Sequence, residues 1–369
     1  MRLLLILILA LCGCTQKNTV ITPNGKSLSY KLDNGVKVFH LTAEPVKQEF
    51  APGLVINAWG YNGSTPGPTI EAVEGDRVRI IVSNKLPEPT TIHWHGILVP
   101  NNMDGVAGLT QAPIEPGSNF VYEFSLKQHG TYMYHPQYDK VTQIGMGMMG
   151  FFIIHPKEPL GPPVDRDFAI FLHEWYVPPG ASTPDPMLMT DFNYATFNGR
   201  VFPGTEALVV KKNDRVRIRF ANLSMNNHPI HLHGHAFSVV ARGGWRLPEA
   251  ARYFGSTIDV AAGNTCDIEF VADETGDWAL QSQKTLLSVN GIGHNIPNMI
   301  GVNEEDLVEK LKNIFPDYVP VGTTGLGAMF DGRHRDLKRP PNFLPYGSPG
   351  PYGVIDMGGM FTILKVLQI

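Results

Sequence analysis

Four histidines of this 369-residue chain form two pairs, each with one residue between its members. The pairs are His93-Trp94-His95-Gly96 and His231-Leu232-His233-Gly234. Residues two apart on a β-strand project from the same face, so each pair can present two imidazoles together. Neutral imidazole nitrogens are good ligands for copper and zinc. The pairs therefore predict a metal site, whereas isolated histidines favour a hydrogen-bonded structural role: His40, His129, His155, His173 and His334.

The two histidine pairs belong to an internal duplication. The run Asp76-Arg77-Val78-Arg79-Ile80 recurs as Asp214-Arg215-Val216-Arg217-Ile218, and each pair begins 17 residues after its aspartate. A second pair of segments also aligns, with His135 and Gln281 each five residues after a glycine. Matching offsets at several separate places indicate two copies of one structural unit.

Composition and patterning predict an all-β protein with two tandem β-sandwich domains. Each copy has short runs of alternating polar and apolar residues, and turn formers are abundant, with Gly 38 and Pro 30. We place the domains at residues 46–158 and 159–303, after a tether and lead-in at 14–45. A C-terminal extension at 304–369 closes with a strand near Phe361 to Val366. A net charge of -4 without a basic run predicts no nucleic-acid partner.

The N-terminus has the pattern of an export signal. Arg2 precedes an apolar run from Leu3 to Leu11, which is shorter than the roughly 20 residues that span a bilayer. The following Leu11-Cys12-Gly13-Cys14 resembles the lipobox of bacterial lipoproteins. That resemblance implies removal of residues 1–13 and a lipid anchor on Cys14, facing the periplasm and on the outer membrane if the cell is Gram-negative. The alternative is an ordinary secretory signal.

Three motifs resemble those of two-domain multicopper oxidases. They are His93-Trp94-His95-Gly96, the segment Gly130 to His135, and His228-Pro229-Ile230-His231-Leu232-His233-Gly234. The resemblance extends from about Val46 to Ile369. It implies two cupredoxin-like Greek-key β-sandwiches, copper as the cofactor, and ligands contributed by both domains.

The family pattern assigns a role to each matching position. It implies that His93 and His231 bind the type 2 copper, and that His95, His135 and His233 bind the type 3 pair. The other type 3 positions carry weak amide ligands: Gln137, Gln281 and Gln283. At the type 1 site His228 remains, but the cysteine, second histidine and axial methionine are replaced by Ser282, Leu287 and Ile292.

The sequence therefore predicts a reduced metal site without type 1 copper. A blue copper site needs a thiolate, which Ser282 lacks. Cys266 is in phase with Ile268 and Phe270 on a predicted strand, so we expect it to pack inward. Five histidines favour fewer than four coppers per chain, with zinc possible. Asp104 matches a family carboxylate that orients water or relays protons, although it also suits a turn before Gly105.

In two-domain relatives the copper cluster forms between the first domain of one subunit and the second domain of the next. The resemblance therefore implies a homotrimer with its metal site at the subunit interface. We predict an exported copper-binding protein with a role in copper binding or tolerance. Two alternatives stay open: an active oxidase that uses O2 to oxidise Cu(I) or phenols, and a metal-free cupredoxin scaffold for partner binding.

Overall fold

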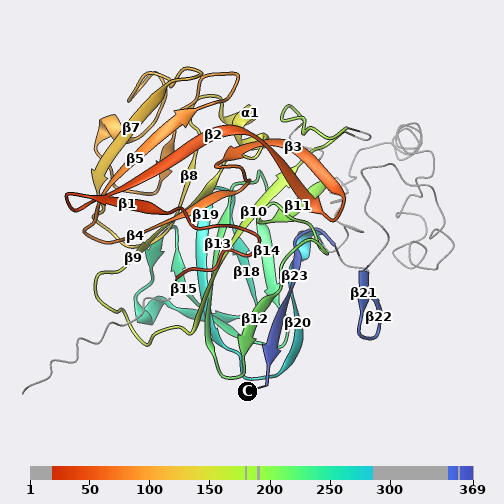
Figure 1. Cartoon of the computed structure of the whole chain (residues 1–369). Coiled ribbons are helices and arrows are strands. Elements are labelled where there is room, and N and C mark those ends of the chain that lie inside the picture. The colour runs from red at the N-terminus through yellow and green to blue at the C-terminus, as the bar shows by residue number, and fades with distance from the viewer. Residues whose placement is uncertain (1–18, 179–180, 189–191, 286–347, 356–357, 369) are drawn as a thin grey trace, which may run out of the picture.

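The structure is a computed structural model that describes residues 19–178, 181–188, 192–285, 348–355 and 358–368. It contains two β-sandwiches packed side by side (Figure 1). The prediction of an all-β protein is confirmed. Among the described residues no helix is long and apolar enough to cross a membrane.

The first sandwich combines a five-stranded and a four-stranded sheet. The five-stranded sheet contains β1 (Tyr30–Asp33), β2 (Val36–Ala51), β3 (Leu54–Tyr61), β5 (Arg77–Asn84) and β7 (Asn119–Ser125). The four-stranded sheet contains β4 (Gly67–Val73), β6 (His93–His95), β8 (Gly130–His135) and β9 (Gly150–His155). The short helix α1 (Lys140–Gly145) and the 3-10 turn η1 (Asn101–Met103) lie in the connections.

The second sandwich repeats this arrangement, with more strands in each sheet. Its seven-stranded sheet contains β10 (Arg166–Trp175), β11 (Tyr194–Phe197), β13 (Arg215–Asn222), β15 (Phe237–Arg242), β16 (Trp245–Arg246), β17 (Tyr253–Gly255) and β19 (Asn264–Val271). Its five-stranded sheet contains β12 (Leu208–Lys211), β14 (His228–Leu232), β18 (Thr257–Val260), β20 (Gly276–Ser282) and β23 (Phe361–Leu367). The turns η2 (Glu249–Ala251) and η3 (Gln283–Thr285) and the hairpin of β21 (Ser348–Gly350) and β22 (Gly353–Ile355) complete the described elements.

Strand pairing is consistent with the duplication predicted from the sequence. The parallel pair β2–β5 of the first sandwich matches the parallel pair β10–β13 of the second. The parallel pairs β4–β9 and β12–β23 also correspond. Parallel neighbours need a crossover connection, so repeating both crossovers gives the two halves the same topology.

Two predicted boundaries differ from the observed ones. Strand β2 crosses the expected domain start at residue 46, and its residues from Val36 onward pair with β5. Even Val20 is buried, and Ile21 forms a bridge with Phe168, so residues 19–45 pack on the protein instead of forming a tether. At the other end, β23 lies between β12 and β20, so the last strand belongs to the second sandwich and not to an extension. The sequence pattern predicted this strand but not its pairing partners.

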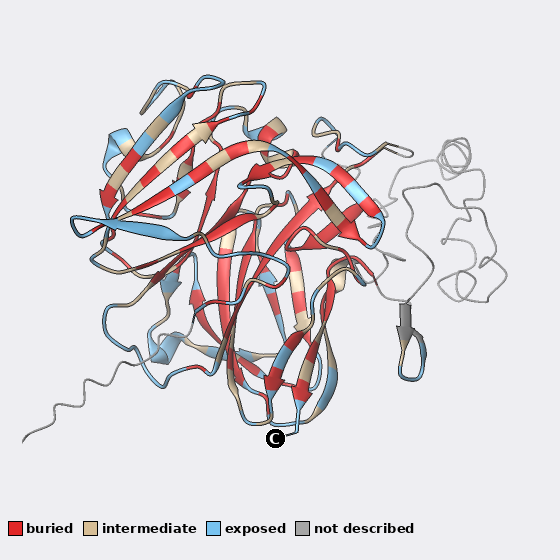
Figure 2. Cartoon of the chain, viewed as in Figure 1, coloured by how far each residue is buried: buried red, intermediate tan, exposed pale blue. Residues whose placement is uncertain are grey.

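An apolar layer joins the two sandwiches. The buried residues continue from one sandwich into the other across their contact (Figure 2). One cluster there brings Met133, Met149 and Phe151 of the first sandwich against Phe171 and Ala221 of the second. Met146, Met148 and Met149 are all buried, as expected of core methionines.

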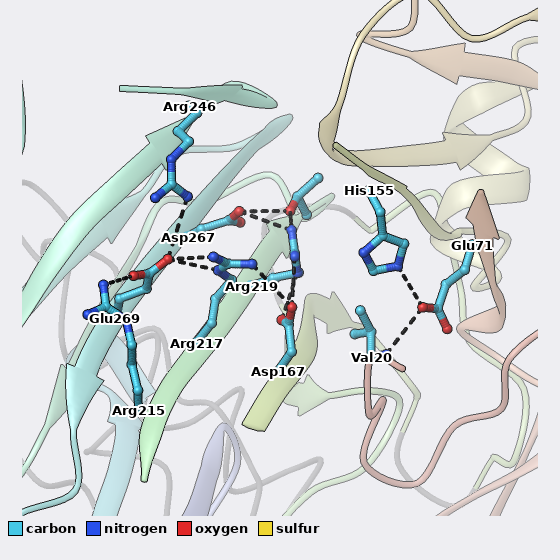
Figure 3. Close-up of polar contacts among 11 residues, drawn as sticks. Val20, Glu71, His155, Asp167, Arg215, Arg217, Arg219, Arg246, Asp267 and Glu269 are labelled. Atoms are coloured by element: carbon cyan, nitrogen blue, oxygen red, sulfur yellow. Dashed lines mark hydrogen bonds and ion pairs between the residues drawn. The ribbon is translucent and has the colours of Figure 1, made fainter. Parts of the chain in front are cut away.

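A charged network adds specific contacts at this interface (Figure 3). The Arg219 guanidinium makes two hydrogen bonds of 2.8 Å to Asp167 and lies 3.3 Å from Asp267. It also donates to the Thr131 hydroxyl of the first sandwich at 2.8 Å, and that hydroxyl donates to Asp267 at 3.0 Å. Burial lowers the pKa of Arg219, but its ion pairs with Asp167 and Asp267 outweigh this and raise it. The network favours one orientation of the sandwiches, because Thr131 of the first sandwich completes the hydrogen bonds of Arg219 and Asp267 only in this packing.

Candidate metal centre

The first sandwich brings three of the predicted ligands together. His93 and His95 lie on β6, and His135 ends β8, where it pairs in register with His93. One ligand atom from each of these histidines lies within 4.8 Å of the others. Between the two β6 histidines, Trp94 is fully buried in the core, which directs both imidazoles to the opposite face.

Backbone carbonyls orient these imidazoles for metal binding. His93 Nδ1 donates to the carbonyl of Asp104 at 2.8 Å, and His135 Nδ1 donates to the carbonyl of Pro136 at 2.9 Å. When the ring is neutral, the opposite nitrogen, Nε2, of His93 and of His135 therefore carries the lone pair. His135 Nε2 faces His95 Nδ1 at 3.1 Å. Metal-binding histidines characteristically donate their second N–H to a carbonyl or carboxylate in this way.

Burial favours the neutral, metal-binding form of His95 and His135. Burial, together with the neighbouring His93, lowers the pKa of His95. Burial also lowers the pKa of His135 to about 3. Neutral imidazoles offer lone pairs, so the chemistry of this donor set fits copper or zinc. We call His93, His95 and His135 the first-domain trio.

Asp104 is placed to orient one member of the trio. Its carboxylate Oδ1 lies 3.3 Å from His93 Nδ1, beside the hydrogen bond from that nitrogen to the Asp104 carbonyl. Asp104 also ends the turn η1, and a Cβ on Gly105 would collide with the carbonyl of Ile92. Both interpretations of Asp104 thus have a geometric basis, because the turn is what brings the residue to His93.

The second sandwich holds its two ligands less firmly. His231 Nδ1 donates to the Ser256 carbonyl at 2.8 Å and lies 2.9 Å from the Thr257 hydroxyl. His233 is exposed, and its Nε2 lies 3.3 Å from the Gln281 amide nitrogen. The Gln281 amide therefore makes a contact at the nitrogen that a metal would use. Gln281 Oε1 is buried without a hydrogen-bond partner.

Within one chain the two sets of histidines do not form a single cluster. In the part of the chain that the structure describes, the first-domain trio is the only group of three metal-binding side chains with ligand atoms this close. Gln137 lines a cavity beside the trio, and Gln283 lies in η3. Leu287, Ile292 and Cys14 lie outside the described residues.

Hydrogen bonds occupy the position predicted for the lost type 1 copper. His228 is fully buried, and its Nδ1 lies 3.2 Å from the Ser282 hydroxyl. Its Nε2 lies 3.0 Å from the Ser224 hydroxyl and 3.7 Å from the Glu174 carboxylate. Burial lowers the pKa of His228 to about 3. The side chain that corresponds to the thiolate is thus a hydroxyl that hydrogen-bonds to the histidine.

Cys266 cannot replace the missing thiolate. Its side chain is buried in the core of the second sandwich, where its strand β19 pairs with Phe220 of β13. Burial raises the pKa of its thiol to about 12, so the thiolate form is disfavoured. The prediction that Cys266 packs inward is confirmed.

The sequence reasoning missed a cavity between the two sandwiches. This cavity of about 480 Å³ is lined by the whole first-domain trio and, from the second sandwich, by His173, Glu174 and Ser224. His173 and Glu174 stand in the apolar strand Phe168 to Trp175, where a charged residue is unusual. These two polar residues in an apolar strand were the sequence signal for a site. They did not reveal that the first-domain trio lines the same cavity.

The other isolated histidines have varied environments. His155 contacts Glu71 at 2.9 Å and His129 contacts Glu74 at 3.0 Å, as expected of structural residues. His40 is exposed on β2. His334 lies outside the described residues.

Comparison with known proteins gives a consistent family assignment. Residues 43–159 match one family model described as multicopper oxidase, and residues 177–299 match a second model with the same description. Copper resistance protein A of Pseudomonas syringae pv. tomato is 44% identical over 118 residues, which cover 32% of this chain and 19% of that protein. The chain thus spans about a fifth of the length of this curated relative.

Longer matches extend over both sandwiches. Multicopper oxidase MmcO of Mycobacterium tuberculosis is 29% identical over 238 residues, which cover 56% of this chain and 46% of that protein. The crystal structure of a blue copper oxidase from Nitrosomonas europaea superimposes with a TM-score of 0.66 at 25% identity, covering 89% of this chain and 85% of the other. The similarity therefore includes the fold of both domains.

Proposed function

This chain belongs to the multicopper oxidase family, and we propose that it is an exported copper-binding protein with a reduced histidine site and no type 1 copper. The observation that carries the proposal is the first-domain trio, whose ligand atoms converge within 4.8 Å of one another. Copper bound there would supply a centre that alternates between Cu(I) and Cu(II). A role in copper binding or tolerance is supported by the similarity to copper resistance protein A.

The residues around the trio would position its ligands. The carbonyls of Asp104 and Pro136 fix the orientation of His93 and His135, and the Asp104 carboxylate can hold a proton or a water beside His93. Ser282 has no thiolate to offer, and its hydrogen bond to His228 fills the position of the electron-entry copper. Fewer than four coppers per chain follow from this donor set.

We also propose that the second-domain histidines complete the site of a neighbouring subunit. His233 is exposed and His231 is partly exposed, so neither is satisfied by the first domain of its own chain. In a homotrimer, each pair could approach the trio of the next subunit. Export and anchoring through lipid on Cys14 form the last part of the proposal, with Cys14→Ala and metabolic labelling with a fatty acid as its test.

The central test is metal quantitation on purified protein exposed to copper and then dialysed. We expect about one non-blue copper per chain, without an intense thiolate-to-copper absorption band. His93→Ala should lose this copper, whereas the matched control His40→Ala, on an exposed histidine, should keep it. No bound metal, or equal copper in both variants, would contradict the proposal. Oxygen uptake with Cu(I) or phenols would instead support an active oxidase.

A further inference from the structure

The cavity between the two sandwiches has features of a small-molecule site. Its volume of about 480 Å³ lies within the roughly 300 to 1,000 Å³ usual for such sites. Its lining includes the first-domain trio, which offers metal-binding nitrogens. The cavity therefore gives a molecule from solution direct access to any metal held by the trio.

Apolar and aromatic side chains form much of its wall. Val141 and Ile144 of α1 line it from the first sandwich, and Tyr176, Phe192, Leu223 and Met225 line it from the second. Aromatic rings and a methionine thioether favour contact with another ring. These walls suit an uncharged, planar molecule better than a hydrated ion.

One polar side chain in the cavity lining, His173, lacks the hydrogen-bond partners that a buried imidazole normally has. His173 is only 4% exposed, and neither of its ring nitrogens makes a hydrogen bond of normal geometry, although backbone groups of Leu223 and Ile144 lie close enough to affect its pKa. Burial lowers that pKa to about 3, so the ring is neutral and can offer one donor and one acceptor. A buried polar group without partners costs free energy that a ligand could recover.

Glu174 provides a second polar position next to His173. Its carboxylate accepts a hydrogen bond of 2.7 Å from Asn226, and it lines the same cavity. Both residues lie on β10 of the second sandwich, whereas the trio lies on β6 and β8 of the first. The cavity is thus lined by apolar side chains and by polar groups from both domains.

We propose that this cavity binds a small, uncharged aromatic molecule whose polar edge interacts with His173 and whose heteroatom reaches the first-domain trio. The contact with a metal rests on the proposed function, whereas the contacts with His173 and the apolar walls do not. Binding at this place would bring the ligand to the histidine trio within one chain, from the side of the domain interface.

Benzimidazole is a suitable probe because it is uncharged at neutral pH and carries one N–H and one free ring nitrogen. Isothermal titration calorimetry would measure its binding to metal-free protein and to protein loaded with Zn2+, which is redox-silent. We expect saturable binding to both forms, at least about tenfold tighter with zinc. Zinc content, measured separately, reports whether the proposed function holds.

Val141→Trp tests whether the probe occupies the cavity. Val141 lines the cavity and is 40% exposed, so a larger side chain there should block the cavity edge without disturbing the core. We expect binding of benzimidazole to weaken at least about tenfold. The matched control is Val121→Trp on β7, which is 45% exposed and lies outside the cavity, and should bind as the wild type does.

His173→Phe tests the polar contact while it keeps a ring beside Trp175, whose centroid lies 4.7 Å from that of His173. We expect binding to metal-free protein to weaken about fivefold to tenfold, with zinc content unchanged. The proposal is overturned if neither form of the folded wild type binds benzimidazole saturably, or if Val141→Trp binds it as tightly as the wild type. If the wild type bound no zinc, the proposed function would be contradicted. The titration of benzimidazole into metal-free protein would then test the cavity by itself.

Discussion

The two copies of the duplicated unit hold their histidines in different ways. In the first sandwich, His95 and His135 face each other at 3.1 Å, and His135 is 5% exposed. In the second, His233 is exposed, and its nearest counterpart is the amide of Gln281 at 3.3 Å. Both histidine strands have an antiparallel neighbour at corresponding places, β8 beside β6 and β20 beside β14, but β14 also pairs with β18, whereas β6 is an edge strand.

Burial and ligand type account for the difference between the two copies. In the first copy, burial lowers the pKa of His95 and His135, and backbone carbonyls orient His93 and His135. In the second copy His231 also donates to a carbonyl, but His233 is exposed and Gln281 stands at the position that aligns with His135. The two halves of a duplicated fold can thus differ in the donor groups that each provides.

The largest change in stability is expected at the contact between the two sandwiches, because the charged groups there are buried. Arg219→Met should lower the free energy of unfolding by about 3 to 5 kcal/mol, since it leaves Asp167 and Asp267 buried without their cation. Urea denaturation would measure it. The control Arg79→Met, whose guanidinium pairs with Asp33 and Glu123 near the surface, should cost much less. A similar decrease in the free energy of unfolding of both variants would show that the buried ion pairs contribute no more than exposed ones.

Removal of a ligand from each copy measures their unequal strength directly. His135→Ala should weaken zinc binding at least about 100-fold, because even residues that only orient a ligand contribute tenfold to 100-fold. His231→Ala should weaken it about tenfold, because the second copy adds fewer and more exposed ligands. Competition with a chromophoric chelator would give both values. A loss with His231→Ala as large as that with His135→Ala would mean that the two halves contribute equally.

The pH dependence of stability tests how strongly the interface buries polar groups beside the trio. The pKa of His173 is lowered to about 3 in the folded chain, so below its ordinary value the unfolded chain binds a proton that the folded chain does not. The contribution of His173 therefore leaves the free energy of unfolding unchanged above pH about 6.5. Below that pH it lowers the free energy of unfolding progressively, down to about pH 3.

His173→Phe should remove this dependence. We expect the slope of unfolding free energy against pH to decrease by about 1.4 kcal/mol per pH unit in that window. Urea denaturation at several pH values would show it, with the exposed His40→Phe as a control. Parallel curves for the wild type and His173→Phe would disprove the assignment of a neutral, buried His173.

The smallest expected effect comes from repairing the weaker copy. Gln281→His would place an imidazole beside His233, where the amide nitrogen now lies 3.3 Å away. We expect zinc to bind the second sandwich about tenfold more tightly, measured in the His135→Ala background so that the first copy does not interfere. An unchanged affinity would indicate that exposure, and not the missing imidazole, limits this half-site.

Much of the site could be predicted from residue spacing. The alternation of β6, with Trp94 in the core, places His93 and His95 on one face whatever the rest of the fold does. The family resemblance likewise predicted Gln281 and Ser282 at ligand positions, and the structure places them beside His233 and His228. The family and the sandwich architecture follow from the same motifs.

Only the tertiary structure decided which residues from distant strands share a site. The meeting of His173 and Glu174 with the trio depends on how one sandwich packs on the other, a contact that strand periodicity does not encode. The same is true of β23, which pairs between β12 and β20 although it is far from both in the sequence. The sequence alone determined ligand type and strand face, because both are local properties. Burial, pKa and cavities are set by the packing of segments far apart in the chain.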